Sequence, residues 1–361
     1  MIKIILIIFY VIFYTQSLIS QYVGIVCLGE STYIQKIELD NNGNITIGSL
    51  YTAIAWPIRL EITNNGLVLV ANYSYGPTGP LSVFKIFNNG DIIKVRDYSL
   101  DGFGHEAKIT KDNKYCLIIH SVENNPLHVA GITILELMND DINPYIRQFY
   151  PYGQGYELAT SGTGLVFDMG TRYIKILQMD SDGVLTDTGQ LLDTGDTGNQ
   201  ELEVSPDNKY VYVAKIGGLL IYEIDENNNV TYKGRAQSSY YPDPTDIIVS
   251  KDSKTVLLLN LGSLEVYNVQ ENGDLIFNGQ KFLLPLAQSA TITPDGKFVV
   301  VAYDYRLEQE GLLSTLAVFR MNFDGTVTNL NKDVTLDNLP GEMKFYQLPT
   351  PSVDIDWKLY E

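Results

Sequence analysis

The chain has 361 residues, and its 25 lysines and arginines against 43 aspartates and glutamates give a formal net charge of −18. Such an acidic chain lacks the clustered cations with which proteins bind nucleic acids or anionic membrane surfaces, so both kinds of partner are excluded. Hydrophobic residues make up 45% of the chain, which favours a packed globular protein over a disordered one. Two cysteines exclude a disulfide-dense scaffold and a Cys-rich zinc module, and three histidines leave little material for a His-based metal site.

The first residues have the pattern of a secretory leader. Lys3 precedes an unbroken apolar run from Ile4 to Tyr14, and polar residues follow it. The run is shorter than the roughly 20 residues that a membrane-spanning helix needs, so it predicts a cleaved signal peptide over residues 1–20. An uncleaved anchor is the alternative. No later stretch is long and apolar enough to span a bilayer, and we therefore expect a secreted protein of residues 21–361 with no membrane span.

Three triplets of the form Asn-x-Ser/Thr agree with a secretory route. They predict glycosylation at Asn44, Asn72 and Asn229.

One pattern recurs along the chain: an alternating strand, a Ser or Thr, a tight polar turn and a strongly apolar strand. Six copies are explicit, among them ELEVSPDNKYVYVAK, DIIVSKDSKTVLLLN and SATITPDGKFVVVAY. The Ser or Thr of each copy recurs at intervals of 43 to 51 residues, at Thr63, Thr110, Ser161, Ser205, Ser250 and Thr293. Each copy continues into a third run, a turn such as NNGD or ENGD, and a fourth strand. This period predicts units that are antiparallel meanders of four strands.

The two ends of the chain supply a seventh unit. YVGIVCLG, residues 22–29, matches a second strand with no first strand before it, and SVDIDWKLYE, residues 352–361, matches a first strand with no second strand after it. We therefore predict an all-β protein, a single seven-bladed β-propeller over residues 21–361, closed by the C-terminal strand pairing with the N-terminal blade. A β-sandwich or a two-domain β protein, the alternatives, explains neither the period nor the complementary ends. We expect a monomer.

Other features of the propeller follow from this assignment. Cys27 and Cys116 fall in second strands of the first and third blades, too far apart for a disulfide, so we expect two buried thiols. The segments 304–311 and 329–349 are longer than the usual loops of the repeat, so we expect them to be insertions that could contact a partner.

The runs VSPDNKYVYVAK, ITPDGKFVVVAYD and LSVFKIFNNGDI resemble the seven-bladed propellers of the lactonase family, which includes bacterial 6-phosphogluconolactonases and fungal carboxymuconate-type cyclases. The resemblance covers nearly the whole mature chain. It implies a ligand site at the mouth of the central channel, where enzymes of the family carry histidines and arginines. Gly104-His105-Glu106 is similar to the family's histidine-bearing third blade, whereas Gly155-Tyr156-Glu157 departs from its Arg-His pattern.

The repeat also defines a ring of channel residues without reference to any family. The residue four positions before each recurring Ser or Thr lies at an equivalent place around the channel. These positions are Arg59, Glu106, Glu157, Glu201, Asp246 and Ser289, with Ser352 from the C-terminal strand. Four consecutive carboxylates, Glu106, Glu157, Glu201 and Asp246, could bind Ca²⁺ or Mg²⁺, or a cationic or polyhydroxylated ligand. The interpretation we favour is that each carboxylate binds a backbone amide or hydroxyl of the next blade.

Two functions are compatible with this ring. The first is a secreted module that binds a small molecule or a protein at an acidic channel mouth formed by Arg59, His105, Glu106, Tyr156, Glu157, Glu201, Asp246 and Ser289. The second is a hydrolase or cyclase that acts on a lactone-like or sugar-derived small molecule. For an enzyme, the candidate catalytic residues are His105, Glu157 and Arg59, because they could place a base or a cation beside a carboxylate. No cofactor other than Ca²⁺ or Mg²⁺ is indicated.

Overall fold

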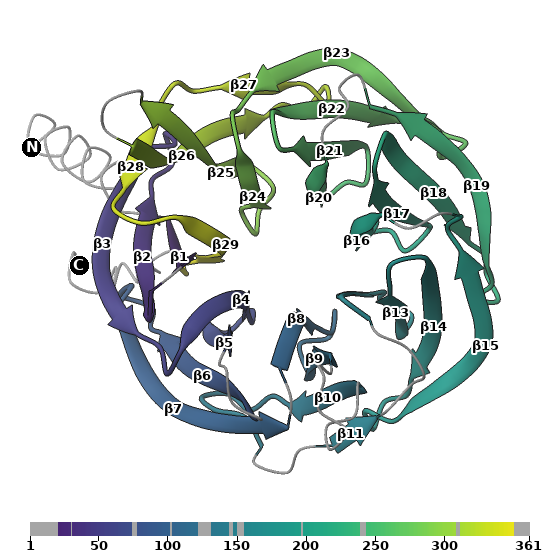
Figure 1. The fold of residues 1–361 in the computed structure, drawn as a ribbon, viewed down its shortest axis with the longest axis horizontal. Helices are drawn as coiled ribbons and strands as arrows, with labels where there is room; N and C mark the ends of the chain where they lie inside the picture. Colours follow the sequence, from purple (N-terminus) through teal and green to yellow (C-terminus); the bar gives the residue numbers. More distant parts are fainter. Residues whose placement is uncertain are drawn as a thin grey trace, which may run out of the picture.

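The computed structural model describes residues 21–29, 31–73, 78–101, 103–121, 131–143, 147–149, 155–195, 198–238, 243–307 and 311–349. The predicted leader over residues 1–20 therefore lies outside the described residues. Within them, the regular structure consists of β-strands that form seven antiparallel sheets. Figure 1 shows these sheets arranged as the blades of a ring, each with its first strand innermost. The predicted seven-bladed β-propeller is confirmed.

The blades follow one another in chain order, and the strands of each are given from the channel outwards. Blade 1 consists of β29 (Pro340–Gln347), β1 (Tyr22–Leu28), β2 (Tyr33–Leu39) and β3 (Ile45–Thr52). Blade 2 consists of β4 (Trp56–Ile62), β5 (Leu67–Tyr73), β6 (Thr78–Ile86) and β7 (Ile92–Asp101). Blade 3 consists of β8 (Phe103–Ile109), β9 (Tyr115–Ser121), β10 (Gly131–Glu136) and β11 (Arg147–Phe149). Blade 4 consists of β12 (Glu157–Thr160), β13 (Leu165–Met169), β14 (Tyr173–Met179) and β15 (Leu185–Asp193).

The last three blades repeat the arrangement. Blade 5 consists of β16 (Asn199–Val204), β17 (Tyr210–Lys215), β18 (Gly218–Ile224) and β19 (Val230–Gln237). Blade 6 consists of β20 (Pro244–Val249), β21 (Thr255–Asn260), β22 (Ser263–Val269) and β23 (Leu275–Leu283). Blade 7 consists of β24 (Ala287–Ile292), β25 (Phe298–Leu307), β26 (Gly311–Met321) and β27 (Val327–Asn329), and β28 (Val334–Leu336) also pairs with β26.

A strand from the C-terminal part of the chain closes the ring, as predicted, but it is a different strand from the predicted one. β29 pairs antiparallel with β1, with Gly24 opposite Phe345 and Ile25 opposite Lys344. The prediction that residues 352–361 form this strand is therefore wrong, and so is the prediction that residues 329–349 are a loop insertion. The segment GEMKFYQ lacks the Ser/Thr and turn that mark the other first strands, which is why its strand character was missed.

The repeated turn after each first strand is held by its Ser or Thr. In blade 5, Ser205 Oγ donates to Asp207 Oδ1 at 2.6 Å and accepts from the backbone N–H of Tyr210 at 2.9 Å. Ser250 and Thr293 make the equivalent bonds to the Asp two residues on and to the N–H five residues on. The hydroxyl thus accepts a backbone N–H of the second strand at the turn that follows the first strand. This hydrogen bond explains why Ser or Thr recurs at this position.

The hydrophobic core lies between the blades. The described residues form seven clusters of buried side chains, and each cluster joins two neighbouring blades. The cluster between blades 7 and 1 contains Phe298 and Val318 from one side and Tyr22 and Phe345 from the other. Cys27 and Cys116 are buried free thiols, as predicted. Among the described residues, no helix is long and apolar enough to cross a membrane.

The three predicted glycosylation sites differ in exposure. Asn44 and Asn229 lie exposed in turns at the ends of outer strands. Asn72 is only 1% exposed, and its side-chain amide donates to the carbonyl oxygens of Val70 and Pro80. A glycan must leave its asparagine towards solvent, so the fold has no room for one at Asn72.

Candidate functional site

A β-bulge directs the channel residues. In blades 1, 2, 3, 5, 6 and 7, the register between the first and second strands shifts by one residue just before the channel position. The extra residue is unpaired, and a bulge of this kind bends the strand and re-aims its side chains. His105 is the extra residue of β8, between Gly104 and Glu106 in the pairing with β9. The placement of its side chain lies outside what the structure describes.

The ring predicted from the repeat is present at six positions, and its seventh member is corrected. Because β29 closes blade 1, the residue at the seventh position is Glu342 and not Ser352, which lies outside the described residues. Two residues further along each strand, a second level of side chains faces the same side, since alternate residues of a strand share a face. This level contains Glu61, Lys108, Glu203 and Lys344.

Arg59 joins two of the predicted carboxylates. Its Nε lies 2.6 Å from Glu106 Oε2, and its Nη2 donates to Glu157 Oε1 at 3.1 Å. Lys108 Nζ lies 3.3 Å from the other oxygen of Glu106. Burial opposes ionisation of Glu106, which is 2% exposed, but Lys108 and Arg59 outweigh it and hold the pKa of Glu106 at about 2. This wall of the channel is therefore an ion-pair network between blades 2, 3 and 4.

Blade 1 extends this network. Lys344 Nζ lies 3.2 Å from Glu342 Oε1 and 3.4 Å from Glu61 Oε1. The other oxygen of Glu342 accepts the backbone N–H of Leu60 in blade 2 at 2.7 Å. Asp246 makes the same kind of tie, since its Oδ2 accepts the N–H of Ala290 in blade 7 at 2.8 Å. The favoured interpretation, a carboxylate that binds the backbone of the next blade, thus holds at Asp246 among the four predicted carboxylates. Glu342, which was not predicted, makes the same kind of tie.

The opposite wall, from blades 5 and 6, carries carboxyl groups without cations. Among the described residues, Glu201 and Glu203 of β16 have no ion pair and no hydrogen-bond partner. Burial raises the pKa of Glu201 to about 8 and that of Asp246 to about 6. Burial and the nearby charge of Glu201 also raise the pKa of Glu157 well above its ordinary value. The carboxyl group of Glu201 is therefore mostly protonated at pH 7.

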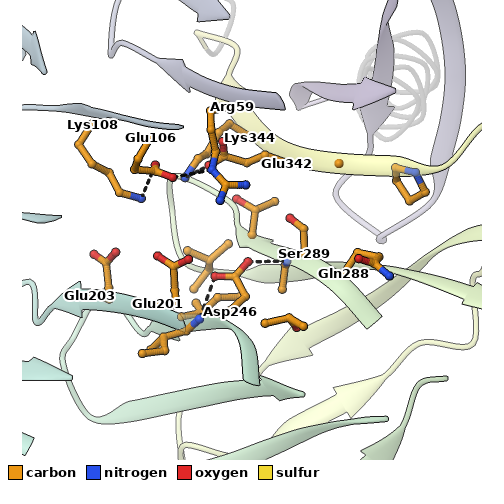
Figure 2. A pocket seen from close by; sticks show the side chains of 18 of the residues that line it. Arg59, Glu106, Lys108, Glu201, Glu203, Asp246, Gln288, Ser289, Glu342 and Lys344 are labelled. Atoms are coloured by element: carbon orange, nitrogen blue, oxygen red, sulfur yellow. Dashed lines mark hydrogen bonds and ion pairs between the residues drawn. The ribbon is translucent and has the colours of Figure 1, made fainter. Parts of the chain in front are cut away.

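Between the two walls lies a cavity of about 370 Å³. Figure 2 shows Arg59, Glu106 and Lys108 on one side of it and Glu201, Glu203 and Asp246 on the other. Two hydroxyl groups that line it, Ser289 Oγ and Thr245 Oγ1, are buried and have no hydrogen-bond partner among the described residues. Buried polar groups in proteins are nearly always hydrogen-bonded, so these atoms identify places where a ligand or water would bind.

The described residues contain no group of three or more His, Cys, Asp or Glu arranged to hold a metal ion. The predicted metal set of Glu106, Glu157, Glu201 and Asp246 is therefore not formed. The physical reason is that Arg59 lies between the first two carboxylates, while the fourth is held by the backbone of the next blade. Tyr156 precedes β12 with its side chain exposed, and it is not among the cavity-lining residues.

Of the three cations Arg59, Lys108 and Lys344, only Arg59 lies at a ring position defined by the repeat. Lys108 and Lys344 are two residues beyond ring positions, so a search of the second level along each first strand finds Lys108. Finding Lys344 also requires knowledge of which strand closes the ring. With Arg59, these lysines balance much of the negative charge that the first level suggests. The channel is consequently a mixed polar cavity rather than a uniformly acidic mouth.

No protein-family model and no curated protein matches the sequence. Solved structures share its fold. A putative 6-phosphogluconolactonase from Bacteroides uniformis is 16% identical, with a TM-score of 0.74 over 90% of this chain and 99% of that chain. The periplasmic gluconolactonase of Pseudomonas aeruginosa is also 16% identical, with a TM-score of 0.74 over 91% and 99%. A functionally unknown protein from Desulfotomaculum acetoxidans is 18% identical, with a TM-score of 0.71 over 91% and 99%. The chain thus has the fold of the lactonase-type seven-bladed propellers.

Proposed function

We propose that this protein is a secreted, monomeric binding module that takes a small polyhydroxylated molecule, a sugar or a sugar lactone, into the cavity of its central channel. The observation that carries the proposal is the pair of buried hydroxyls without partners, Ser289 Oγ and Thr245 Oγ1, in the cavity wall. A ligand with several hydroxyl groups can donate to and accept from such atoms at once.

The size and polarity of the cavity support this class of ligand. Its volume of about 370 Å³ is at the lower end of small-molecule pockets, which hold roughly 300–1,000 Å³. Its wall offers hydroxyls, an amide at Gln288, carboxyl groups that can be protonated, and the cations Arg59, Lys108 and Lys344. Two proteins that share the fold are a putative 6-phosphogluconolactonase and a periplasmic gluconolactonase, which agrees with a sugar-derived ligand.

A hydrolase acting on a lactone is the second candidate, and the separation of the pKa values of Asp246 and Glu201 favours it. At neutral pH, Asp246 is mostly ionised and Glu201 mostly protonated. Such a pair could supply a base to take a proton from the attacking water and an acid to protonate the leaving ring oxygen. In that reaction Arg59 or Lys108 would stabilise the negative charge that develops on the carbonyl oxygen.

The test is thermal unfolding of the purified protein with glucose, sorbitol and glucono-δ-lactone, alongside an assay of lactone hydrolysis. A ligand at 100 times its Kd is expected to stabilise the protein by about 2.7 kcal/mol. Ser289→Ala should abolish most of this ligand effect with little change in the unliganded protein, because Ser289 Oγ has no partner to lose. Ser181→Ala, in an exposed turn, is the matched control.

Each result has a clear meaning. Stabilisation without turnover supports the binding module. Turnover above the spontaneous rate that is lost in Asp246→Asn supports the hydrolase. If no sugar, polyol or lactone in the panel changes the unfolding temperature and none is hydrolysed, the proposed function is wrong.

A further inference from the structure

Two carboxyl groups of blade 5 face the cavity without a contact ion pair. Glu201 and Glu203 are two residues apart on β16, so they share the channel side of the strand, and both line the cavity. Neither has an ion pair or a hydrogen bond within the described part of the chain. Figure 2 shows both side chains on the wall opposite Arg59.

The repeat explains why Glu201 is left free. At Glu342 and Asp246, the carboxylate accepts the N–H of the residue just after the ring position of the next blade. The equivalent donor for Glu201 is the N–H of Ile247. That N–H already donates to Asp246 Oδ1 at 2.8 Å. Glu201 therefore cannot make the tie that Glu342 and Asp246 make.

The cations of the channel are occupied elsewhere. Arg59 pairs with Glu106 and Glu157, Lys108 pairs with Glu106, and Lys344 pairs with Glu61 and Glu342. Each of these contacts lies among blades 1 to 4. The wall formed by blades 5 and 6 thus has acidic groups and no described lysine or arginine in contact with them.

A separate observation concerns the hydroxyl groups that line the same cavity. Ser289 of blade 7 is only 8% exposed, it lines the same cavity, and its Oγ has no partner. Thr245 of blade 6 is half-buried, but its Oγ1 is also buried and has no partner among the described residues. These hydroxyls would bind ligand oxygens beside the position where Glu201 and Glu203 would receive a positive charge.

We propose that the cavity prefers amino sugars: a protonated amine of the ligand binds Glu201 and Glu203, and its hydroxyls bind Ser289 and Thr245. This inference rests on the proposed function and names its ligand class more narrowly. An ammonium group needs only acceptor oxygens on one side, so it does not require the closed set of ligands that a metal ion would.

Protonation of Glu201 provides an independent signature. In the free protein, burial keeps the pKa of Glu201 at about 8, so its carboxyl is mostly protonated at pH 7. A bound ammonium stabilises the ionised form and lowers that pKa. Binding of an amino sugar at pH 7 should therefore release protons, whereas binding of the matching neutral sugar should not.

The experiment compares glucosamine with glucose by calorimetric titration at pH 7, in two buffers of different ionisation enthalpy. We expect roughly tenfold tighter binding of glucosamine, the size of one charge-assisted hydrogen bond, together with proton release. Glu201→Gln and Glu203→Gln should each reduce the ratio of glucosamine affinity to glucose affinity. Glu226→Gln, the same substitution in an exposed turn, should change neither.

The outcomes separate this inference from the proposed function. Equal binding of glucose and glucosamine would overturn the inference and leave the proposed function standing. Absence of binding for both sugars and for the lactone would overturn both. A glucosamine preference that persists in both Gln variants would show that the amine does not bind Glu201 and Glu203, and would overturn the assignment. Unfolding temperatures of the variants establish that each is folded.

Discussion

At the scale of single residues, Arg59 has the largest effect on the character of the channel. It stands at the ring position where five other blades have a carboxylate, and it contacts two of these carboxylates, Glu106 and Glu157. Burial opposes its charge, but those two carboxylates outweigh it and raise the pKa of Arg59 further. The guanidinium is suited to this place because its planar fork can bind two partners at once.

Replacing Arg59 with methionine is expected to destabilise the protein by about 2 kcal/mol at pH 7, since it leaves Glu106 and Glu157 without their shared cation. The figure is below that for a fully buried pair because about a third of the Arg59 side chain is exposed. Urea unfolding is the measurement. Arg172→Met removes a bidentate pair with Asp193 on the surface, and as the control it should cost less than about 1 kcal/mol.

The loss caused by Arg59→Met should also depend on pH. The pKa of Glu106 is about 2 in the folded protein and 4.5 for a free side chain, so its ionised form contributes stability above pH 4.5. That contribution disappears as the pH falls from 4.5 towards 2. The difference between wild type and variant should therefore shrink over this range. A difference that is constant from pH 7 to pH 3 would contradict the role given to the ion pairs.

At the scale of elements, each blade depends on tight turns that also contact the neighbouring blade. Gly273, in the turn between β22 and β23, has a φ of +83°, a conformation that favours glycine. A methyl group there would overlap the ring of Tyr210 in blade 5. Gly279, in β23, has a similar φ of +90°, but open space surrounds the corresponding position. A comparison of alanine substitutions at the two glycines therefore separates the cost of backbone strain from the cost of disturbed packing.

Gly279→Ala is expected to cost about 1 kcal/mol, the strain of placing a side chain at positive φ. Gly273→Ala has the same strain and must also displace Tyr210, so we expect a total of about 3 kcal/mol. Chemical denaturation of both variants gives the comparison. Equal losses would show that the contact between blades 5 and 6 at this turn does not contribute.

At the scale of the whole molecule, the ring has no end because β29 supplies the innermost strand of blade 1. Seven interfaces between blades share the hydrophobic core, and two of them include residues of β29: Met343 and Phe345 on one side, and Tyr346 on the other. Loss of this strand would expose an edge of β1 and open both interfaces.

A chain that ends at residue 337 is expected to lose cooperative thermal unfolding, since it lacks β29. A chain that ends at residue 349 should keep it, because the closing strand is intact. Near-ultraviolet circular dichroism during heating measures both. If the longer truncation product also failed to fold cooperatively, the closing strand would have to be sought in residues 350–361.

The sequence by itself determined the architecture and most of the ring. Seven four-stranded blades follow from the interval between the recurring Ser and Thr residues and from the complementary half-units at the two ends. Both features can be found in the sequence because the alternation of a strand and the residues of its turn depend on neighbouring residues. The same interval located Arg59, Glu106, Glu157, Glu201, Asp246 and Ser289 around one channel. It also placed the two cysteines in separate blades, where they are buried thiols.

Only the tertiary structure decided how these groups meet. It identified β29 as the closing strand, brought Lys108 and Lys344 among the carboxylates, and left Glu201 and Glu203 without partners. The fold also buries Asn72, although its triplet has the same Asn-x-Ser/Thr pattern as those at Asn44 and Asn229. These outcomes depend on contacts between residues far apart in the chain. The charge, burial and hydrogen bonding of a channel residue are set by the neighbouring blades, which the local pattern of its own strand does not contain.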